Sequence, residues 1–391
     1  MILRVLCLDI EGGYGGSSRS LYESLRHMDR DAVSPEVWCV REGPIQSRYE
    51  ELGIPTRVVG PLPCHNALPR ASRNILALAQ AQLALWKRRS LLGELEDAAR
   101  RFDVIHHNQE SLFLLANRLR RRTGVRQVMH LRTNAEPSLF ARWQARTIAR
   151  AVDHVICITE NERESWPGHG LKGPPVMVIY NIARVPATPV APHESVPQDA
   201  RFRVACVSNF AWVRGVDRLV EVAKVLRDRG RDDVLFVLAG DMRLRGSMPG
   251  KLGEIAQRGG SLADYAEAEG VSSYFLFLGH VANPEAVLSA CHITARSSRG
   301  NNPWGRETLE ALAFARPVIA TGSYDVFVED GVTGCLLPEY DPHSFADAVL
   351  RLADDAPYRE TLGEAAADRI RTLCHGPDRA ADLLSVWRST L

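Results

Sequence analysis

The 391-residue sequence contains no run of about 18 uncharged apolar residues, the minimum length of a membrane-spanning helix. It also lacks an excess of charge of either sign, because 48 Lys and Arg residues stand against 47 Asp and Glu residues and the formal net charge is +1. That balance argues against a dedicated nucleic-acid-binding protein. The N-terminus, Met1 to Asp9, is apolar but interrupted by Arg4, and we interpret it as a β-strand rather than a signal peptide.

Cysteine motifs are absent as well. None of the eight cysteines forms a C-x-x-C pair, and no histidine lies at a spacing typical of a zinc site. We therefore predict a reduced protein of the cytoplasm. The D-x-D string Asp29-x-Asp31 lies where a predicted helix passes into a loop and not after a strand. We accordingly predict no metal site and no cofactor.

Basic residues gather in the first half of the chain. Residues 1–190 contain 26 Lys and Arg against 19 Asp and Glu, whereas residues 191–391 contain 22 against 28. The basic residues of the first half fit either solvated helix faces or contact with an anionic membrane or an acidic substrate. Two clusters stand out: Lys87-Arg88-Arg89, and Arg118, Arg120, Arg121, Arg122 and Arg126.

The first of these clusters lies in a predicted amphipathic helix over 72–101. The apolar stripe of this helix packs on the protein's own sheet or, in the alternative interpretation, lies on a membrane surface. The stripe consists of Leu76, Ala79, Leu83, Trp86, Leu91, Leu92 and Leu95.

Short apolar runs rich in Val, Ile and Leu recur along the chain, and each is followed by a turn and a helical pattern. Such runs are typical of strands buried on both faces, and their alternation with helices indicates parallel α/β sheets. We predict two doubly wound, Rossmann-like domains that face each other across a cleft. The predicted strands cover 2–8, 35–40, 103–107, 126–130, 154–158 and 176–180, then 202–207, 233–239, 274–278, 292–295, 317–320 and 334–337.

A proline-rich stretch separates the two predicted domains. Between Ala183 and Ala200 the sequence has four prolines and almost no apolar periodicity, which is typical of a semi-rigid connector. We predict an N-terminal domain over 1–183, a linker over 184–200 and a C-terminal domain over 201–375. A last helix is predicted over 376–391, and its return to the N-terminal domain is one option.

Glycines follow the first predicted strand, in the loop 11–16 that opens a helix near Ser18. Glycine lets backbone N–H groups approach a ligand closely, and a helix N-terminus favours a phosphate. As a dinucleotide fingerprint, Gly13-x-Gly15-x-x-Ser18 lacks the third glycine, and the next strand ends at Val40-Arg41 without an acid for a ribose. We predict phosphate contact here; a nicotinamide-dependent oxidoreductase and a plain turn are the alternatives.

Two loops of the second half carry polar groups at the ends of predicted strands. Arg214 ends the loop 207–217, and a guanidinium there can bind phosphate oxygens in a bidentate manner. The loop 296–305 leads into a predicted helix whose free N–H groups favour an anion. One turn inside that helix, Glu310 can accept two hydroxyl hydrogen bonds, as a ribose diol requires.

The segment from Asn302 to Ala320 resembles a family signature. It reads Asn302-Pro303-Trp304-Gly305, then Glu310-Ala311, then Pro317-Val318-Ile319-Ala320. This order is similar to E-x-F-G-x-x-x-x-E-A-x-A-x-G-x-P-V-[IV]-A, the C-terminal signature of the retaining GT-B glycosyltransferases of family 4. The resemblance extends along most of the chain, through the glycine loop and the segments 103–106, 153–159, 178–181, 277–279 and 329–334.

This resemblance implies a retaining glycosyltransferase. A sugar would pass from a nucleotide-diphosphate donor, UDP- or GDP-linked, to a hydroxyl of a saccharide, lipid-linked or natural-product acceptor. The C-terminal domain would hold the donor, with Glu310 on the ribose, Arg214 on a phosphate and the amides of Trp304 and Gly305 near the diphosphate or sugar. The implied donor-binding residues are Gly15, Gly16, Asn209, Arg214, His280, Val281, Pro303, Trp304, Gly305 and Glu310.

The resemblance also assigns residues near the reacting sugar and the acceptor. His130 ends a predicted strand and matches the family's histidine beside the reacting sugar, so it is a candidate catalytic residue together with Asn302. His107, Asn108 and Arg132 are candidates for the acceptor side. The family needs neither a protein nucleophile nor a metal, because the departing diphosphate can take the acceptor proton.

The sequence departs from the family pattern at several positions. Asn302 replaces a glutamate that holds the transferred sugar, and Asn209 replaces an arginine. After the Pro-Val strand, the usual Gly-Gly-x-x-Glu reads Gly-Ser-Tyr-Asp-Val over 322–326. The missing cation would have to come from Arg296, Arg299 or Arg306. A catalytically impaired nucleotide-sugar-binding protein of the same fold is therefore the alternative prediction.

Overall fold

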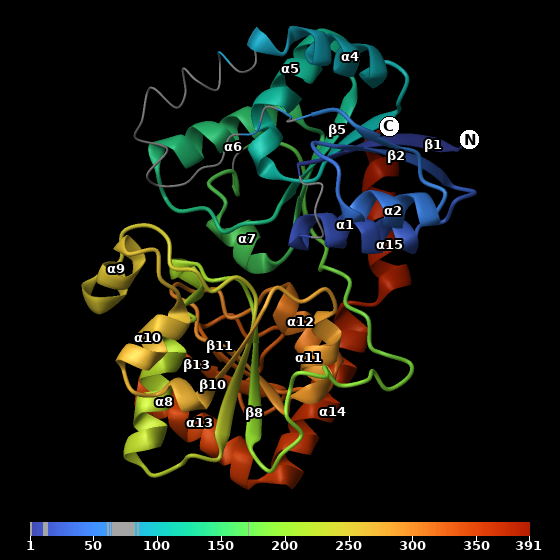
Figure 1. Cartoon of the computed structure of the whole chain (residues 1–391). Helices are drawn as coiled ribbons and strands as arrows, with labels where there is room; N and C mark the ends of the chain where they lie inside the picture. Colours follow the sequence, from blue (N-terminus) through green and yellow to red (C-terminus); the bar gives the residue numbers. More distant parts are fainter. Residues whose placement is uncertain are drawn as a thin grey trace. The chain divides into compact units, whose positions relative to one another are not determined.

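The computed structural model describes residues 2–10, 15–60, 62, 64, 83, 86–170 and 172–391. The chain divides into two compact units, one comprising Met1–Ile182 with His375–Leu391 and the other Ala183–Cys374. The end of the chain therefore belongs to the same unit as its beginning, as Figure 1 shows for the helix near the C-terminus.

The first unit contains a seven-stranded parallel sheet in the order β3-β2-β1-β4-β5-β6-β7. Its strands are β1 (Leu3–Asp9), β2 (Val33–Cys39), β3 (Thr56–Val58), β4 (Val104–His107), β5 (Arg126–Leu131), β6 (His154–Cys157) and β7 (Val176–Val178). Its helices are α1 (Gly16–Arg26), α2 (Pro44–Glu51), α4 (Arg89–Ala99), α5 (Phe113–Thr123), α6 (Leu139–Ala151), α7 (Glu160–Ser165) and α15 (Gly376–Ser389), with the 3-10 turn η1 (Glu110–Leu112).

Strand β1 shows why an unbroken apolar run forms a central strand. Val5 and Cys7 belong to one buried cluster and Leu6 and Leu8 to another, so alternate side chains pack on opposite faces of the sheet. Helix α15 joins the first of these clusters through four side chains and lies against α1 (Figure 1). These four are Leu383, Leu384, Val386 and Trp387.

The second unit contains a six-stranded parallel sheet in the order β10-β9-β8-β11-β12-β13. Its strands are β8 (Phe202–Val207), β9 (Val234–Ala239), β10 (Phe275–Gly279), β11 (Ile293–Arg296), β12 (Val318–Thr321) and β13 (Gly334–Leu337). Its helices are α8 (Arg218–Asp228), α9 (Gly250–Gln257), α10 (Leu262–Ala268), α11 (Pro284–Ala290), α12 (Arg306–Ala313), α13 (Pro342–Asp354) and α14 (Ala356–Leu373), with the 3-10 turns η2 (Trp212–Arg214) and η3 (Ser272–Tyr274).

The predicted fold class is confirmed, and each of the twelve predicted strands is present within one or two residues of its expected bounds. The short edge strand β3 was not predicted, because three residues of mixed polarity carry too little periodicity to be recognised. Among the described residues, no helix is both long enough and apolar enough to cross a membrane.

Part of the predicted helix over 72–101 lies outside the described residues, including Leu76 and Ala79. The described end of it, α4, buries Leu92 and Leu95 completely in the cluster that also contains Leu6 and Leu8 of β1. This part of the apolar stripe therefore packs on the protein's own sheet and does not face a membrane surface. Leu83 and Trp86, in contrast, are about half exposed.

Candidate functional site

Each sheet has one place where the strand order reverses, and the loops after the strands at such a point form the usual ligand site of doubly wound folds. In the first sheet this point lies between β1 and β4, and in the second between β8 and β11. The loop after β8 contains Asn209 and Arg214, and the loop after β11 leads to the N-terminus of α12. The second switch point therefore carries most of the predicted donor-binding residues.

The two loops of the second switch point pack tightly on each other. Gly215 has a φ of +65°, and a Cβ there would lie 1.9 Å from the carbonyl oxygen of Ser297. The Ser297 hydroxyl donates to the Gly215 carbonyl at 2.8 Å, and the Arg299 amide donates to the Val213 carbonyl at 2.8 Å. Only glycine fits at position 215, and its presence fixes the spacing of the loops.

Arg214 lies at the end of η2 with an exposed side chain. Its Nη1 donates to the Ser208 hydroxyl at 3.0 Å and to the Asn209 carbonyl at 3.1 Å. Among the described residues, no carboxylate oxygen lies within 4.0 Å of its guanidinium. Arg214 is thus oriented by neutral partners and keeps a positive charge for an incoming anion.

The three arginines considered as substitutes for the missing cation all have acidic partners. Arg296 pairs with Glu307, Arg299 with Asp217, and Arg306 with Glu310. Arg299 also stacks on Trp212, with its guanidinium carbon 3.4 Å from the ring centroid. Their charges are already balanced, so among the arginines weighed for phosphate contact Arg214 has the strongest case.

Glu310 lies one turn inside α12 and is largely buried. Its Oε1 lies 3.0 Å from Arg306 Nε, and the two side chains are 9% and 11% exposed. The helix begins after Gly305, whose extended backbone provides no side-chain cap for the first N–H groups. A carboxylate and an uncapped helix N-terminus therefore lie together at the second switch point, where they suit a hydroxyl pair and an anion respectively.

The residues just before α12 are packed inward. Trp304 is 4% exposed, and its ring centroid lies 5.3 Å from that of Phe327. Asn302 is half-buried, and its side-chain Oδ1 is buried without a hydrogen-bond partner among the described residues, as is Trp304 Nε1. The Asn302 backbone carbonyl accepts from Arg296 Nε at 3.0 Å and from the Ser298 hydroxyl at 2.8 Å. Pro303 is buried and fixes the loop conformation.

The remaining predicted donor-binding residues lie at the ends of β8 and β10. The Asn209 side chain accepts a hydrogen bond from the Asp241 amide at 2.8 Å, so it ties the loop after β8 to the loop after β9. His280 is exposed and Val281 is half-buried, immediately after β10. Asn209 therefore links these two loops through its side-chain oxygen, an acceptor that an arginine side chain does not have.

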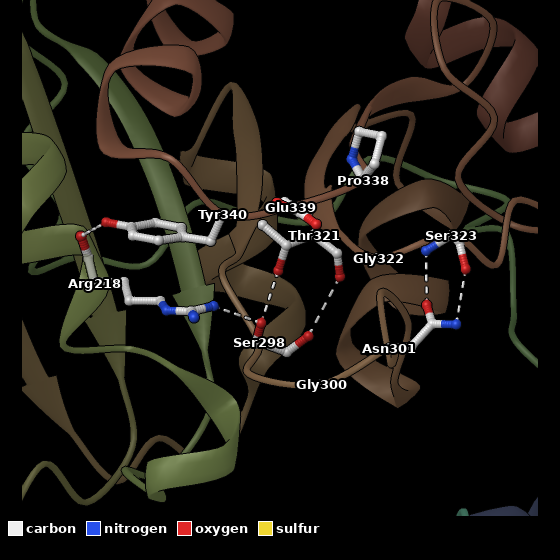
Figure 2. A pocket seen from close by; sticks show the side chains of 10 residues that line it. All are labelled: Arg218, Ser298, Gly300, Asn301, Thr321, Gly322, Ser323, Pro338, Glu339 and Tyr340. Carbon is white, nitrogen blue, oxygen red and sulfur yellow. Dashed lines mark hydrogen bonds between the residues drawn. The ribbon is translucent and has the colours of Figure 1, made fainter.

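A pocket of about 560 Å³ opens in the second unit beside the same loop (Figure 2). On one wall Arg218 donates from Nη1 to the Ser298 carbonyl at 2.7 Å and lies 4.3 Å above the centre of the Tyr340 ring. On the other wall Asn301 donates to the Ser323 hydroxyl and accepts from the Ser323 amide, both at 2.7 Å. This pocket was not predicted from the sequence, although the departure from the family pattern at 322–326 includes Gly322 and Ser323 of its wall.

In the first unit, His130 lies near the C-terminal end of β5, and 5% of it is exposed. Its Nδ1 lies 3.0 Å from His106 Nε2 and 3.5 Å from Arg132 Nη2. His106 Nδ1 in turn accepts from the indole Nε1 of Trp387 at 2.9 Å. Burial, the Arg132 charge and the neighbouring His106 lower the pKa of His130 well below its usual value.

The side chain of His107 points to the opposite face of the sheet from that of His106, because successive side chains of a strand alternate. It is fully buried and its Nε2 bonds to Gln127 Oε1 at 2.8 Å, while Gln127 Nε2 donates to the carbonyls of Ala116 and Ala151. Burial lowers the pKa of His107 to about 4. We therefore interpret His107 as an interior structural group and leave it out of the acceptor site proposed below.

Asn108 and Arg132 form one hydrogen-bonded unit. Arg132 Nε donates to the Asn108 carbonyl at 2.7 Å, and its Nη2 bonds to Asn108 Oδ1. Asn108 is fully buried and donates from Nδ2 to the Ser17 carbonyl at 3.2 Å, at the start of α1. Arg132 is half-buried, so it is the better placed of the two to meet a ligand, with Asn108 holding it.

Gly15 and Gly16 open α1, and Gly15 is its N-cap without a side-chain hydrogen bond. A Cβ added at Gly16 would meet no atom within 4 Å outside the helix's own backbone, counting only the described residues. Residues 11–14 of the predicted phosphate loop lie outside the described residues. Over the described ranges, no group of three or more His, Cys, Asp or Glu side chains is arranged to hold a metal ion.

The second basic cluster is largely paired. Arg118 bonds to Glu96, and both Arg120 and Arg126 bond to Asp153. Exposed basic residues instead follow one side of α6, where Arg142, Arg146 and Arg150 accompany two exposed apolar side chains. These are Leu139, which is 85% exposed, and Trp143, which is 40% exposed.

Two family models match the chain. Residues 15–182 match the model described as "Glycosyl transferase 4-like domain", and residues 201–355 match "Glycosyl transferases group 1". One curated relative is the alpha-D-kanosaminyltransferase of Streptomyces kanamyceticus, 28% identical over 58% of this chain and 58% of that protein. Another is the D-inositol 3-phosphate glycosyltransferase of Corynebacterium glutamicum, 35% identical over 32% of this chain and 31% of its own length. The matches span less than two thirds of these relatives.

Solved structures share the fold over nearly the whole chain. HepE of Anabaena, crystallised with UDP and glucose, gives a TM-score of 0.79 at 20% identity and covers 99% of this chain and 100% of its own. Sucrose-phosphate synthase of Thermosynechococcus elongatus gives a TM-score of 0.68 at 18% identity, with 99% and 98% covered. At this level of identity, the likeness establishes the two-domain α/β architecture alone.

Proposed function

The chain belongs to the group 1 glycosyl transferases and has the GT-B fold of glycosyltransferase family 4, and we propose that it is an active enzyme. In this proposal it transfers a sugar from a nucleotide-diphosphate donor to a hydroxyl group of an acceptor. The observation that carries the proposal is the arrangement at the second switch point. The unneutralised Arg214, the uncapped N-terminus of α12 and the carboxylate of Glu310 supply what a diphosphate and a ribose need.

In this proposal the second unit holds the donor. Arg214 and the first amides of α12 bind the diphosphate, Glu310 accepts hydrogen bonds from the two ribose hydroxyls, and His280 and Val281 border the base. The family's other signature positions, Asn302 to Gly305, line the sugar end, where the Asn302 amide replaces a carboxylate. UDP as the nucleotide is supported by the UDP and glucose in the HepE crystals, and GDP is the alternative that the resemblance leaves open.

The first unit takes the acceptor in this proposal, with Arg132 as its cationic contact. Gly15 and Gly16 remain candidates for close approach to the donor, as the resemblance implies. The named relatives transfer sugars, which supports a saccharide or natural-product hydroxyl as the acceptor. A lipid-linked saccharide is the third class that the proposal includes.

We propose that the configuration at the anomeric carbon is retained. The bond from that carbon to the diphosphate oxygen breaks, and the acceptor oxygen bonds to the same face while its proton passes to the departing diphosphate. Arg214 and the helix terminus stabilise the charge on the leaving group, so the reaction as proposed requires no metal ion. Coupling constants of the anomeric proton in the product test retention, and turnover in excess EDTA tests the metal requirement.

We propose a peripheral contact with anionic lipid for the first unit, through the outer side of α6. Leu139 and Trp143 would enter the interfacial region while Arg142, Arg146 and Arg150 meet lipid phosphates. This surface is favoured over the Arg118 to Arg126 cluster because the charges of Arg118, Arg120 and Arg126 are already paired with carboxylates.

A thermal-shift screen of nucleotide-diphosphate sugars tests the donor class. A specific donor binds the folded protein and raises its melting temperature, whereas the matching sugar 1-phosphate does so much less. A shift followed by transfer to an acceptor supports the enzyme. A shift without transfer to any acceptor supports the alternative, an impaired nucleotide-sugar-binding protein.

A further inference from the structure

Three buried aromatic side chains from separate parts of the chain form a hydrogen-bonded row in the first unit. His106 comes from β4, His130 from β5 and Trp387 from α15 near the C-terminus. His106 and Trp387 are fully buried, and their ring planes are perpendicular with centroids 5.6 Å apart. The two histidine rings have centroids 5.0 Å apart. The family resemblance makes His130 a candidate catalytic residue and gives no role to His106 or Trp387.

The direction of the protons in this row follows from one residue. An indole Nε1–H can only donate, so His106 Nδ1, 2.9 Å away, must be the acceptor and carry no proton. A neutral His106 then carries its proton on Nε2, which lies 3.0 Å from His130 Nδ1 and donates to it. His130 Nδ1 is therefore unprotonated, and its proton must lie on Nε2.

This assignment of protons holds for neutral imidazoles, and the surroundings of both rings disfavour the charged form. Burial is the main cause that lowers the pKa of His106 and of His130 well below the usual value, and the Arg132 charge acts in the same direction on both. Arg132 Nη2, 3.5 Å from His130 Nδ1, is also a group that can only donate. A proton on His130 Nδ1 would face the N–H donors of His106 and of Arg132. Both neighbours therefore favour the tautomer of His130 that carries its proton on Nε2.

We propose that Trp387 and His106 are positioning residues that hold His130 as the Nε2–H tautomer, so that His130 presents a hydrogen-bond donor to the substrate. This rests on the proposed glycosyl transfer and on the family resemblance, which implies that His130 lies beside the transferred sugar. Among the described residues, no group accepts from His130 Nε2. In this form Nε2 has no lone pair for a proton, so His130 donates to an oxygen of the donor or acceptor and does not act as a general base.

The tautomers are observed directly by two-bond ¹H–¹⁵N correlation in protein labelled with ¹⁵N-histidine, with the signals assigned from His106→Gln and His130→Gln. We expect His106 and His130 each to show an unprotonated Nδ1 and a protonated Nε2 at pH 7.5. This spectrum requires no substrate and no variant at Trp387. A protonated Nδ1 on His130, or a doubly protonated ring, overturns the proposal whatever the enzyme transfers.

Trp387→Phe keeps an aromatic ring and removes the donor. Loss of one hydrogen bond of ordinary strength shifts the His106 tautomer equilibrium about fivefold, so its two ¹⁵N shifts should move toward each other. With the best donor found, kcat should fall severalfold while the donor KM stays within about twofold. Trp166→Phe, the same change at another buried tryptophan of the first unit, should alter neither quantity.

The two proposals fail in different ways. If no donor is ever turned over but the tautomers are as expected, the proposed function fails and the positioning of His130 stands. If Trp387→Phe leaves both the ¹⁵N shifts and kcat unchanged in a protein with native circular dichroism, the positioning role of Trp387 is wrong. His106→Phe then gives the second test, because it removes the donor to His130 directly and should lower kcat at least as much.

Discussion

Arg306 Nε lies 3.0 Å from Glu310 Oε1 on successive turns of α12, and the pair is almost completely removed from solvent. The Arg306 guanidinium fixes the position of the Glu310 carboxylate in a place from which solvent is largely excluded. One oxygen of Glu310 is thereby engaged by a cation, and a ribose diol must bond to a carboxylate that is already oriented. Preorganisation of this kind lowers the cost of binding.

Glu310→Gln should weaken the binding of a nucleoside diphosphate by about 10- to 100-fold, because hydrogen bonds to a charged group contribute about 1.5–3 kcal/mol. Isothermal titration calorimetry measures the effect. Glu267→Gln, at an exposed glutamate of α10 in the same unit, is the matched control and should bind as the wild type does. Equal affinity in the two variants would remove Glu310 from the site.

Arg214→Met should weaken binding of a nucleoside diphosphate by at least about tenfold and binding of the corresponding nucleoside much less, because the lost contact is to phosphate. Raising the salt concentration should reduce wild-type affinity more than that of the variant. The control is Arg258→Met, an exposed arginine at the end of α9. If nucleoside and diphosphate lose affinity equally, Arg214 does not contact phosphate.

Glu162 predicts a pH dependence of stability in the first unit. It is 2% exposed, and burial raises its pKa to about 7, partly offset by the hydrogen bond from the Thr159 hydroxyl. A carboxyl whose pKa is higher in the folded than in the unfolded state binds its proton more tightly when folded. The free energy of unfolding therefore falls as the pH rises from about 4.5 to about 7, and this loss remains above pH 7.

Glu162→Gln removes this titration. Relative to the wild type it should be more stable at pH 8, by at most about 3 kcal/mol, and about equally stable at pH 4.5. Urea unfolding at the two pH values measures the difference. Glu164→Gln, at an exposed position of the same helix, should show no such pH-dependent gain. A gain for Glu162→Gln that is the same at both pH values would mean that the carboxyl titrates normally.

The exposed side of α6 predicts retention on liposomes that contain anionic lipid at low salt and release at high salt. Leu139→Ser with Arg146→Gln should reduce retention several-fold. Arg121→Gln with Arg122→Gln, at exposed positions of α5, should have a smaller effect. Equal retention on neutral and anionic liposomes would eliminate the electrostatic contact.

The sequence was sufficient to predict every strand of the two sheets except the edge strand β3, because strands buried on both faces appear as short runs of Val, Ile and Leu. Strand ends then placed Arg214 and Glu310 near one switch point of the second sheet. The pair of Arg306 with Glu310 has the i,i+4 spacing of a helix and was readable from the sequence, whereas the ion pairs of Arg296 and Arg299 were not. Each depends on which carboxylate the fold brings near, and Asp217 lies 82 positions from Arg299 along the chain.

The histidines show the same limit in the first unit. Alternation along β4 implies that His106 and His107 face opposite sides of the sheet, a signal that the sequence contained but that did not tell which side was functional. The contact of His106 with Trp387 joins residues 281 positions apart, and no local pattern predicts it. The role of the last helix as a partner of β4 therefore emerged from the packing alone.

The most direct test of the central claim is calorimetric titration of the wild-type protein with UDP, GDP and ADP, repeated with Arg214→Met and Glu310→Gln together. We expect saturable binding of at least one nucleoside diphosphate at a single site, and its loss in the double variant with the melting curve of the second unit retained. No binding of any of the three by the folded wild type, or undiminished binding by the double variant, would contradict the account.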